Sequence, residues 1–346
     1  MKNIIILIAG LLLFSNLPAY SQCACCSSVG CGDNSVESAI FIPQGKWLLS
    51  ASSNISGFKP LSPQQIQQDA QASSMFNVYN ENNRCIYLLG ISYGISNRFN
   101  ARVVLPYSSI NGLEQGMTGQ LNPVSLGTSN GISNLQASLQ YLILRREYCA
   151  GWEAITSVGL IAPTGIHNNI GANGVLLEDP FQPGADSWVP VLGIIADRKF
   201  AHTTLVADAS YVFKSSSPNG TVDAEYWTSD LTAYTPLLRT GGKLKHSCDS
   251  TGSCSKEPRQ SNFILNMFYG IQFEHVGQDI LMMPDGSNAP GMNIGAFRTY
   301  ADAGVEVTLN GRFFIPVSIA LPVYQAVNGY QVKVSWRVNA CLSYLL

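Results

Sequence analysis

Apolar residues alternate with polar or small residues along segments of about ten residues, and this alternation constrains the fold more than any other feature. The last segment is the most regular. One set of its positions is apolar: Tyr330, Val332, Val334, Trp336, Val338, Ala340, Leu342, Tyr344 and Leu346. The positions between them are polar or small: Gln331, Lys333, Ser335, Arg337, Asn339, Cys341 and Ser343. A period of two predicts a β-strand that has one face in an apolar phase and the other in a polar one.

The length of the segments indicates which apolar phase this is. Strands of soluble sheets average about 5–6 residues, whereas these segments run to ten or more. At ~3.4 Å per residue, such a strand crosses a bilayer even when it is tilted. Aromatic residues also occur near the segment ends, where a membrane barrel carries its interfacial girdles. The pattern therefore predicts an all-β fold, a transmembrane antiparallel β-barrel.

The composition supports the same fold class. Hydrophobic residues make up 46% of the 346 residues and charged residues only 12%, against about 25% charged in soluble domains. After the N-terminal segment, no apolar run reaches the ~18 residues that a membrane-spanning helix needs. The net charge of −2 leaves no basic face for phosphates, which excludes nucleic acid as a partner.

Turn residues separate the strands and limit their number. We expect short polar turns at 96–98, 145–147, 197–199 and 310–312, and long loops at 58–84, 109–130, 163–186 and 276–298. Outer-membrane barrels have short periplasmic turns, longer extracellular loops and an even number of strands. Eleven strands are evident, the first at 45–57, so a further strand is required within 214–260, and we place it near Val222–Tyr234. About twelve strands result, and 239–260 becomes a long periplasmic connection.

The N-terminus carries an export signal. Lys2 supplies its positive charge, Ile4–Leu13 its apolar core, and Ala19-Tyr20-Ser21 the small residues before cleavage. A transmembrane anchor is the alternative, but this core is too short for one, and the bulky Gln22 disfavours acylation of the next residue. We therefore expect a signal peptide at 1–21, a Cys-rich periplasmic segment at 22–44 and an outer-membrane barrel at 45–346.

Four short motifs resemble one family of outer-membrane proteins. They are Tyr93–Phe99 leading to Leu105-Pro106-Tyr107, Ala162–Gly165 after a strand, Gln182–Asp186 before the next strand, and Leu321–Gln331 before the last. They are similar to the family named for the meta-pathway of phenol degradation, in a Bacteroidetes-like form, over roughly residues 85–346. The resemblance implies a barrel for the passage of small organic compounds, without catalytic residues. This chain departs from the family at its end, Tyr344-Leu345-Leu346, which weakens the terminal aromatic signal for the barrel-assembly machinery.

Four cysteines follow the expected cleavage point: Cys23, Cys25, Cys26 and Cys31. Thiolates suit Cu(I) and Zn(II), so this cluster could bind a soft metal such as copper or zinc. Exported cysteines normally oxidise, and the crowded spacing lacks the paired Cys-x₂-Cys form of a zinc site, so we prefer disulfides. Nine cysteines in all leave at least one without an intrachain partner, and Cys248 and Cys254 would form a loop disulfide.

Ionisable residues on the expected polar faces would line the lumen. They are Arg102, Glu153, Asp208, Glu274, Asp302, Glu306, Lys333 and Arg337. These charges could set the selectivity of a narrow or gated passage for small solutes. The alternative is a closed structural or surface-binding barrel in which they neutralise one another. Twelve strands lie between filled barrels of about eight strands and water-filled barrels of about sixteen, and we expect a passage.

The sequence gives little indication of catalysis. It contains neither a Gly-x₄-Gly-Lys-Ser/Thr loop nor a His-Glu-x₂-His pair, and its four histidines are scattered over different segments. We expect no enzyme activity, and no cofactor apart from the metal considered for the N-terminal cysteines. The expected partners are outer-membrane lipid, the barrel-assembly machinery and small solutes.

Overall fold

The structure is a computed structural model of the whole chain. It describes residues 41–73, 77–117, 122–145, 151–200, 203–216, 222–223, 225–240, 263–278, 280–282, 288–290 and 295–346. The expected signal peptide, and the Cys-rich segment as far as residue 40, lie outside this description. Within the described ranges, no helix is long and apolar enough to span a membrane.

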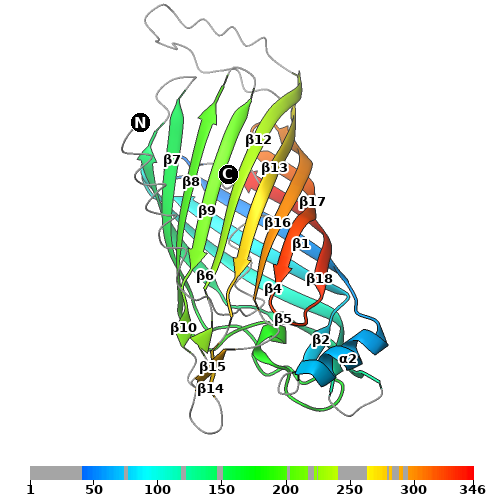
Figure 1. The fold of residues 1–346 in the computed structure, drawn as a ribbon. Coiled ribbons are helices and arrows are strands. Elements are labelled where there is room, and N and C mark those ends of the chain that lie inside the picture. The colour runs from blue at the N-terminus through cyan, green and yellow to red at the C-terminus, as the bar shows by residue number, and fades with distance from the viewer. Residues whose placement is uncertain are drawn as a thin grey trace, which may run out of the picture.

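Twelve long strands form a closed antiparallel barrel (Figure 1). They are β1 (Trp47–Lys59), β3 (Asn83–Gly94), β4 (Phe99–Gly116), β6 (Gln136–Leu144), β7 (Trp152–Ile161), β8 (Val189–Lys199), β9 (Thr204–Val212), β12 (Tyr226–Thr240), β13 (Phe263–Val276), β16 (Ala296–Leu309), β17 (Phe313–Val327) and β18 (Lys333–Leu345). The first strand pairs with the last, β1 with β18, and the ring is completed where β4 pairs with β6. The prediction of an all-β barrel of about twelve strands is confirmed.

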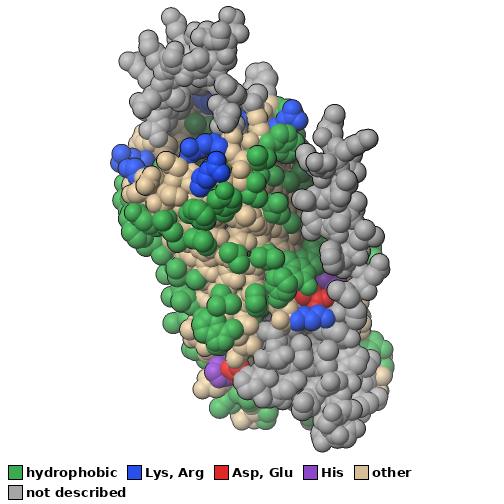
Figure 2. Space-filling model, turned by 90° about the vertical axis from the view of Figure 1, so that its left-hand side faces the viewer, with side chains coloured by type: hydrophobic (Ala, Val, Ile, Leu, Met, Phe, Trp, Pro, Cys, Tyr) green, Lys and Arg blue, Asp and Glu red, His purple; other side chains and the backbone are tan. Residues whose placement is uncertain are grey.

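Side chains alternate between the two faces of this wall as the sequence predicts. On β13, Phe268, Gln272 and Glu274 are buried inside, whereas Tyr269 and Ile271 are exposed outside. The exposed large side chains of the other strands are mostly Leu, Ile, Val and aromatic residues, and Figure 2 shows hydrophobic side chains over the height of the barrel. An apolar exterior of this kind is the surface of a barrel that spans a bilayer.

Aromatic residues meet on this exterior near both ends of the strands. Trp47 packs on Tyr93 at the short-turn end, with ring centroids 4.4 Å apart, as Phe313 does on Tyr344 at 4.5 Å. Toward the long-loop end, the Tyr87–Tyr107 rings lie 6.3 Å apart. Amphipathic rings at two levels are typical of interfacial girdles.

The short turns lie at one end of the barrel. Asn310 and Gly311 both have positive φ, 52° and 59°, which fits a primed two-residue hairpin turn. Ser96 Oγ accepts hydrogen bonds from the backbone N–H groups of Arg98 and Phe99. The turn expected at 197–199 is wrong: these residues continue β8, because Asp197 faces inward and Arg198 lies over the ring of Trp152. Of the turn expected at 145–147, the structure describes only residue 145.

The long loops form a packed layer at the other end. The loop expected at 109–130 is largely a hairpin in which β4 continues beyond the barrel and pairs with β5 (Val124–Ile132). Beside it lie α2 (Pro63–Ser73), β2 (Val78–Asn80) and the 3₁₀ turn η3 (Asp179–Phe181). Their apolar side chains form clusters of their own around Leu113 and Ile66. A capping box starts α2, since Ser62 and Gln65 exchange side-chain to backbone hydrogen bonds.

The strand that parity requires within 214–260 is present, displaced from its expected position. It is β12, whereas Val222–Asp223 belongs to β11 of a small separate sheet. The other strands of this sheet are β10 (Ser215–Ser216), β14 (Ile280–Met282) and β15 (Asn288–Pro290). The pattern of β12 is hard to recognise because Tyr226 and Tyr234 face inward, while Ser229 faces outward.

A β-bulge at Ser335 changes the face of the last strand. Gly57 of β1 pairs with Trp336, and the next residue, Phe58, pairs with Val334. An extra residue in one strand reverses the alternation beyond it. Val334 is therefore buried and Lys333 exposed, although the sequence pattern placed them the other way round.

We expect Leu89→Arg to lower the free energy of unfolding in phospholipid vesicles by about 2–4 kcal/mol, because it puts a charge at membrane depth. Leu89 is 61% exposed and lies between Tyr87 and Tyr93 on the outer face of β3. Val175→Arg is the matched control, since Val175 is 60% exposed but lies in the long loop before β8. Denaturant titrations of both variants measure the costs. Equal costs would contradict the membrane assignment of this face.

Candidate functional site in the barrel lumen

The inner face of the barrel has two unlike halves. The strands from β9 through β18 carry large and charged inward side chains: Asp230, Tyr234, Phe268, Gln272, Glu274, Arg298, Tyr300, Asp302, Glu306 and Arg337. The strands from β3 to β8 carry mostly small or polar ones, among them Gly90, Ser92, Arg102, Ser138, Gln140, Ser157, Gly159 and Gly193. The first half fills its share of the lumen, and the second leaves space.

Arg337 is the centre of a hydrogen-bonded network in the filled half. Its Nη2 donates to Glu274 Oε2 at 2.8 Å and to the Tyr300 hydroxyl at 3.2 Å, and its Nε donates to Ser56 Oγ at 3.2 Å. Arg298 Nη1 donates to the other Glu274 oxygen at 2.6 Å. Glu274 thus has a guanidinium on each oxygen, as a buried carboxylate needs.

The position of this network follows from the strand order. Arg337 lies on β18, and its partners Tyr300 and Glu274 lie on β16 and β13, so the side chain reaches across β17. Ala320 of β17 pairs with Arg337 and is fully buried in the cluster with Tyr300. A small side chain at this position lets the guanidinium pass over the intervening strand. The network therefore ties four strands, β1, β18, β16 and β13, together from inside.

Carboxylates gather beside this network. Asp302 Oδ1 lies 2.8 Å from where a Cβ would stand on Gly270, so this glycine makes room for the carboxylate. Asp230 accepts a hydrogen bond from Thr232, and Glu306 accepts one from Asn266 at 3.0 Å. All three acids are nearly inaccessible to solvent.

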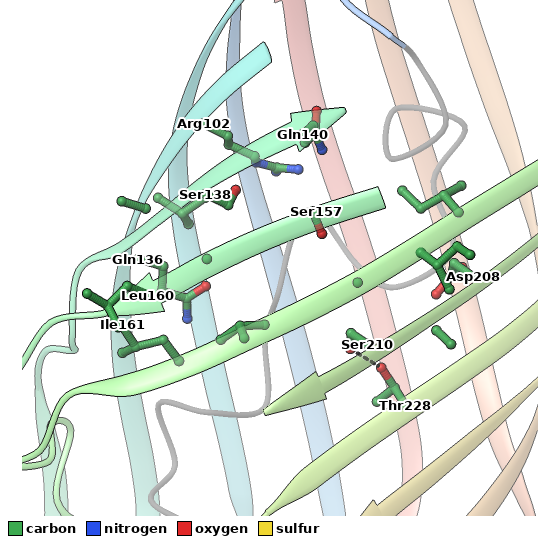
Figure 3. A pocket seen from close by; sticks show the side chains of 18 residues that line it. Arg102, Gln136, Ser138, Gln140, Ser157, Leu160, Ile161, Asp208, Ser210 and Thr228 are labelled. Atoms are coloured by element: carbon green, nitrogen blue, oxygen red, sulfur yellow. Dashed lines mark hydrogen bonds between the residues drawn. The ribbon is translucent and has the colours of Figure 1, made fainter. Parts of the chain in front are cut away.

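The open half contains a cavity of ≈ 80 Å³. Its polar lining comes from cross-strand neighbours: Arg102 pairs with Ser138, Gln140 with Ser157, and Ser157 with Gly193. Ser210 and Thr228 close the far side and share a hydrogen bond of 2.8 Å. Figure 3 shows the guanidinium of Arg102 pointing into this space from β4, with Asp208 on the other side.

Arg102 has no hydrogen bond or ion pair to any of the residues that the structure describes. Its Nε is fully buried without an acceptor, while the side chain as a whole is half-buried. Gly90 lies beside it, since a Cβ there would be 3.8 Å from Nη2. Arg298 and Arg337 both form ion pairs with Glu274. Arg102 differs from them because it faces the cavity instead.

The structure places the eight expected lumen residues as follows. Glu274, Asp302, Glu306 and Arg337 lie in or beside the buried network. Arg102 and Asp208 line the cavity, and Glu153 is half-buried beside Asp197 near the short-turn end. Lys333 is exposed because of the bulge at Ser335.

Sequence reasoning missed three residues of the filled half. Asp230 lies on β12, whose position was displaced, and Arg298 fell within an expected loop. Tyr300 counts as apolar in an alternation pattern, although its hydroxyl accepts from Arg337. The spacing Arg298, Tyr300, Asp302 gives a period of two and would have extended β16 upstream.

The cysteine predictions remain predictions. Cys23, Cys25, Cys26, Cys31, Cys248 and Cys254 lie outside the described residues. Of the cysteines that the structure describes, Cys85 is half-buried on β3, and Cys341 is buried on β18 with its Sγ 3.4 Å from the Ser343 hydroxyl. In the same part of the chain, no cluster of three or more His, Cys, Asp or Glu is arranged to hold a metal ion.

One sequence, Gly127-Thr128-Ser129-Asn130-Gly131, matches the Gly-x-Ser-x-Gly pattern of hydrolase nucleophiles. That motif requires a turn from strand to helix, whereas here it lies within β5, and Ser129 is buried and bonded to Asn169. His167 contacts Asp186 at 3.0 Å and the carbonyl of Gly165 at 3.3 Å, so both its ring nitrogens have oxygen neighbours. Neither feature has the geometry of an activated serine.

We expect Glu274→Gln and Arg337→Met each to lower the free energy of unfolding by about 3–5 kcal/mol, because each leaves a buried charge with fewer partners. The double variant should lose less than the sum, with a coupling energy of about 1–3 kcal/mol. Double-mutant cycles from denaturant unfolding in vesicles measure this. The exposed pair Arg98 and Tyr141, 3.2 Å apart, is the control and should couple by under about 1 kcal/mol. Additive effects at Glu274 and Arg337 would refute the network.

No family model and no curated protein matches this chain. Solved structures do. An outer membrane channel from Pseudomonas putida is 14% identical, covers 92% of this chain and 100% of its own, and has a TM-score of 0.55. The β domain of the Bordetella autotransporter BrkA is 11% identical, with coverages of 87% and 98% and a TM-score of 0.43. A mutant of the TodX monoaromatic hydrocarbon channel is 10% identical, covers 88% of this chain and 90% of its own, and has a TM-score of 0.38. The likeness to the Pseudomonas channel shows that these two chains share a barrel fold.

Proposed function

We propose that this barrel lies in the outer membrane of a Gram-negative cell and lets small solutes cross it. The observation that carries the proposal is the unequal lumen, in which one half is packed and the other leaves a cavity lined by glycine, serine and glutamine together with apolar side chains. A barrel that served only as a scaffold could fill this half with larger side chains. The Pseudomonas putida protein that shares the fold is an outer membrane channel, which supports the proposal.

The size of the cavity limits the passage. An apolar cavity of about 150 Å³ is enough to bind benzene, and the cavity here is smaller, at ≈ 80 Å³. In this conformation it holds water or a few solute atoms, so larger solutes require a movement of the wall or of the layer of loops. The passage is therefore narrow or gated.

The charged residues of the inner face would set its selectivity. Arg102, Asp208 and Glu153 are half-buried at inward positions outside the packed network, and they would meet a solute first. A narrower proposal is that the chain belongs to the meta-pathway family of Bacteroidetes-like proteins and carries small organic compounds. The four motifs that resemble this family support it.

The rival function is a closed barrel whose loops bind a partner at the cell surface. One observation favours it: the long loop before β8 exposes Ile170, Val175 and Leu176, each by about three fifths. Large exposed side chains that lie close together often mark an interaction site. Ile170 and Leu176 are joined by a β-bridge, so they lie side by side.

We expect the full chain, reconstituted in liposomes, to pass a pentose and to exclude a trisaccharide in swelling assays. Ser157→Phe should slow the pentose at least tenfold, because the ring would fill the cavity. Ser53→Phe is the matched control and should leave the rate unchanged, since Ser53 pairs with Tyr87 on the outer face. Swelling no faster than in protein-free vesicles, and no single-channel conductance, would instead identify a closed barrel.

A further inference from the structure

We propose that the lumen contains a binding site for small organic monocarboxylates, centred on the guanidinium of Arg102. The inference rests on the proposed function in that it names the class of solute, but the site itself can be tested by binding alone. Three arginines point inward: Arg102, Arg298 and Arg337. Arg102 is the one of these three whose guanidinium lacks a carboxylate partner in the described part of the chain.

An unpartnered guanidinium inside the barrel is energetically unfavourable. Burying a charged group without a counter-charge is unfavourable, and such groups are normally paired. The Nε–H of Arg102 is buried and donates to no group of the described residues, while the rest of the guanidinium faces the cavity. Arg298 and Arg337 show how this barrel treats its other inward guanidiniums: each is placed within 2.8 Å of a carboxylate oxygen. An anion that entered the cavity would give Arg102 the partner it lacks.

Hydrogen-bonding side chains surround Arg102. Ser138 is its direct cross-strand neighbour on β6, and Ser92 is its neighbour on β3. Gln140 and Ser157 pair with each other one step away, and Figure 3 shows the guanidinium between these two side chains. A planar guanidinium flanked by hydroxyl and amide donors matches the two oxygens of a carboxylate.

The apolar part of the cavity lining favours an organic carboxylate over phosphate. Asp208 lines the same cavity from β9 and carries a negative charge toward its far side. The attraction to Arg102 and the repulsion from Asp208 both double for a phosphate dianion, so charge alone does not select between the two anions. Apolar side chains, among them Val104, Ile161 and Val191, line the rest of the cavity. They would accept the alkyl part of a small organic acid, which phosphate lacks.

The acidic side chains of the other half do not cancel this site. Glu274 is paired with two arginines, and Asp302 and Glu306 are at most 4% exposed. A solute in the cavity therefore meets Arg102 directly, whereas it meets those carboxylates only through the packed network. The charges that a solute meets in the cavity are therefore those of Arg102 and Asp208, and not the sum of all charges on the inner face.

The test is isothermal titration of the full chain in detergent with sodium butyrate, sodium benzoate, sodium phosphate and sodium chloride. We expect butyrate to bind, with a dissociation constant that rises tenfold to a hundredfold in Arg102→Gln, as the loss of a charge-assisted hydrogen bond implies. Benzoate should bind more weakly than butyrate, because the cavity is smaller than one that holds benzene. Arg102→Lys should lose less, because it keeps the charge but not the planar fork. Arg98→Gln, which removes an arginine at the short-turn end, should bind as the wild type does.

Several results would overturn the proposal. They are equal affinity in the wild type and Arg102→Gln, phosphate that binds as tightly as butyrate, or no carboxylate binding at millimolar concentration. Heat-modifiable gel mobility shows whether each variant is folded, and Ser138→Val provides a second variant that weakens the site without removing the charge. Carboxylate binding without any liposome swelling would keep this site and refute the channel. Swelling with a pentose but no carboxylate binding would support the channel and refute the binding site.

Discussion

Backbone hydrogen bonding in a membrane is the constraint on which this structure depends. The bilayer core offers no water to an unpaired N–H or C=O group, so only helices or closed barrels can cross it. The chain meets this requirement with twelve strands whose two joins, β1 with β18 and β4 with β6, leave no edge in the barrel wall. Closure then forces each strand to present one face to lipid and the other to the lumen, which is why residues alternate along every strand.

The lumen is organised by side-chain size at neighbouring positions. Where Ala320 is small, Arg337 reaches over it to Tyr300 and Glu274 and joins four strands. Where Gly193 and Ser157 pair across neighbouring strands, both side chains are small and a cavity remains. The packed half can therefore stabilise the barrel while the open half is free to contact solutes. This division explains how one barrel can contain both a buried ion network and a guanidinium that faces open space.

Some elements could be read from the sequence and others could not. The strands with large outward side chains, such as β13 and most of β18, were predicted because a lipid-facing residue must be apolar. The predicted position of β12 was displaced because the inward positions of this strand include two tyrosines, so its two faces differ little in hydropathy. The frequent Gly and Asn residues of the β4–β5 hairpin predict a loop, although the two strands pair with each other beyond the membrane. The bulge that exposes Lys333 leaves no trace in the period of two.

By itself, the sequence determined the fold class, the antiparallel order, the even strand number and which side chains face inward on regular strands. Each of these follows from local alternation and from the lengths of the connections. Only the tertiary structure decided which inward charges are paired. Glu274 meets Arg298 on the adjacent strand and Arg337 from across β17 and β16, whereas Arg102 meets none of the described carboxylates. Pairing depends on distances across the lumen, and a linear pattern contains no such distances.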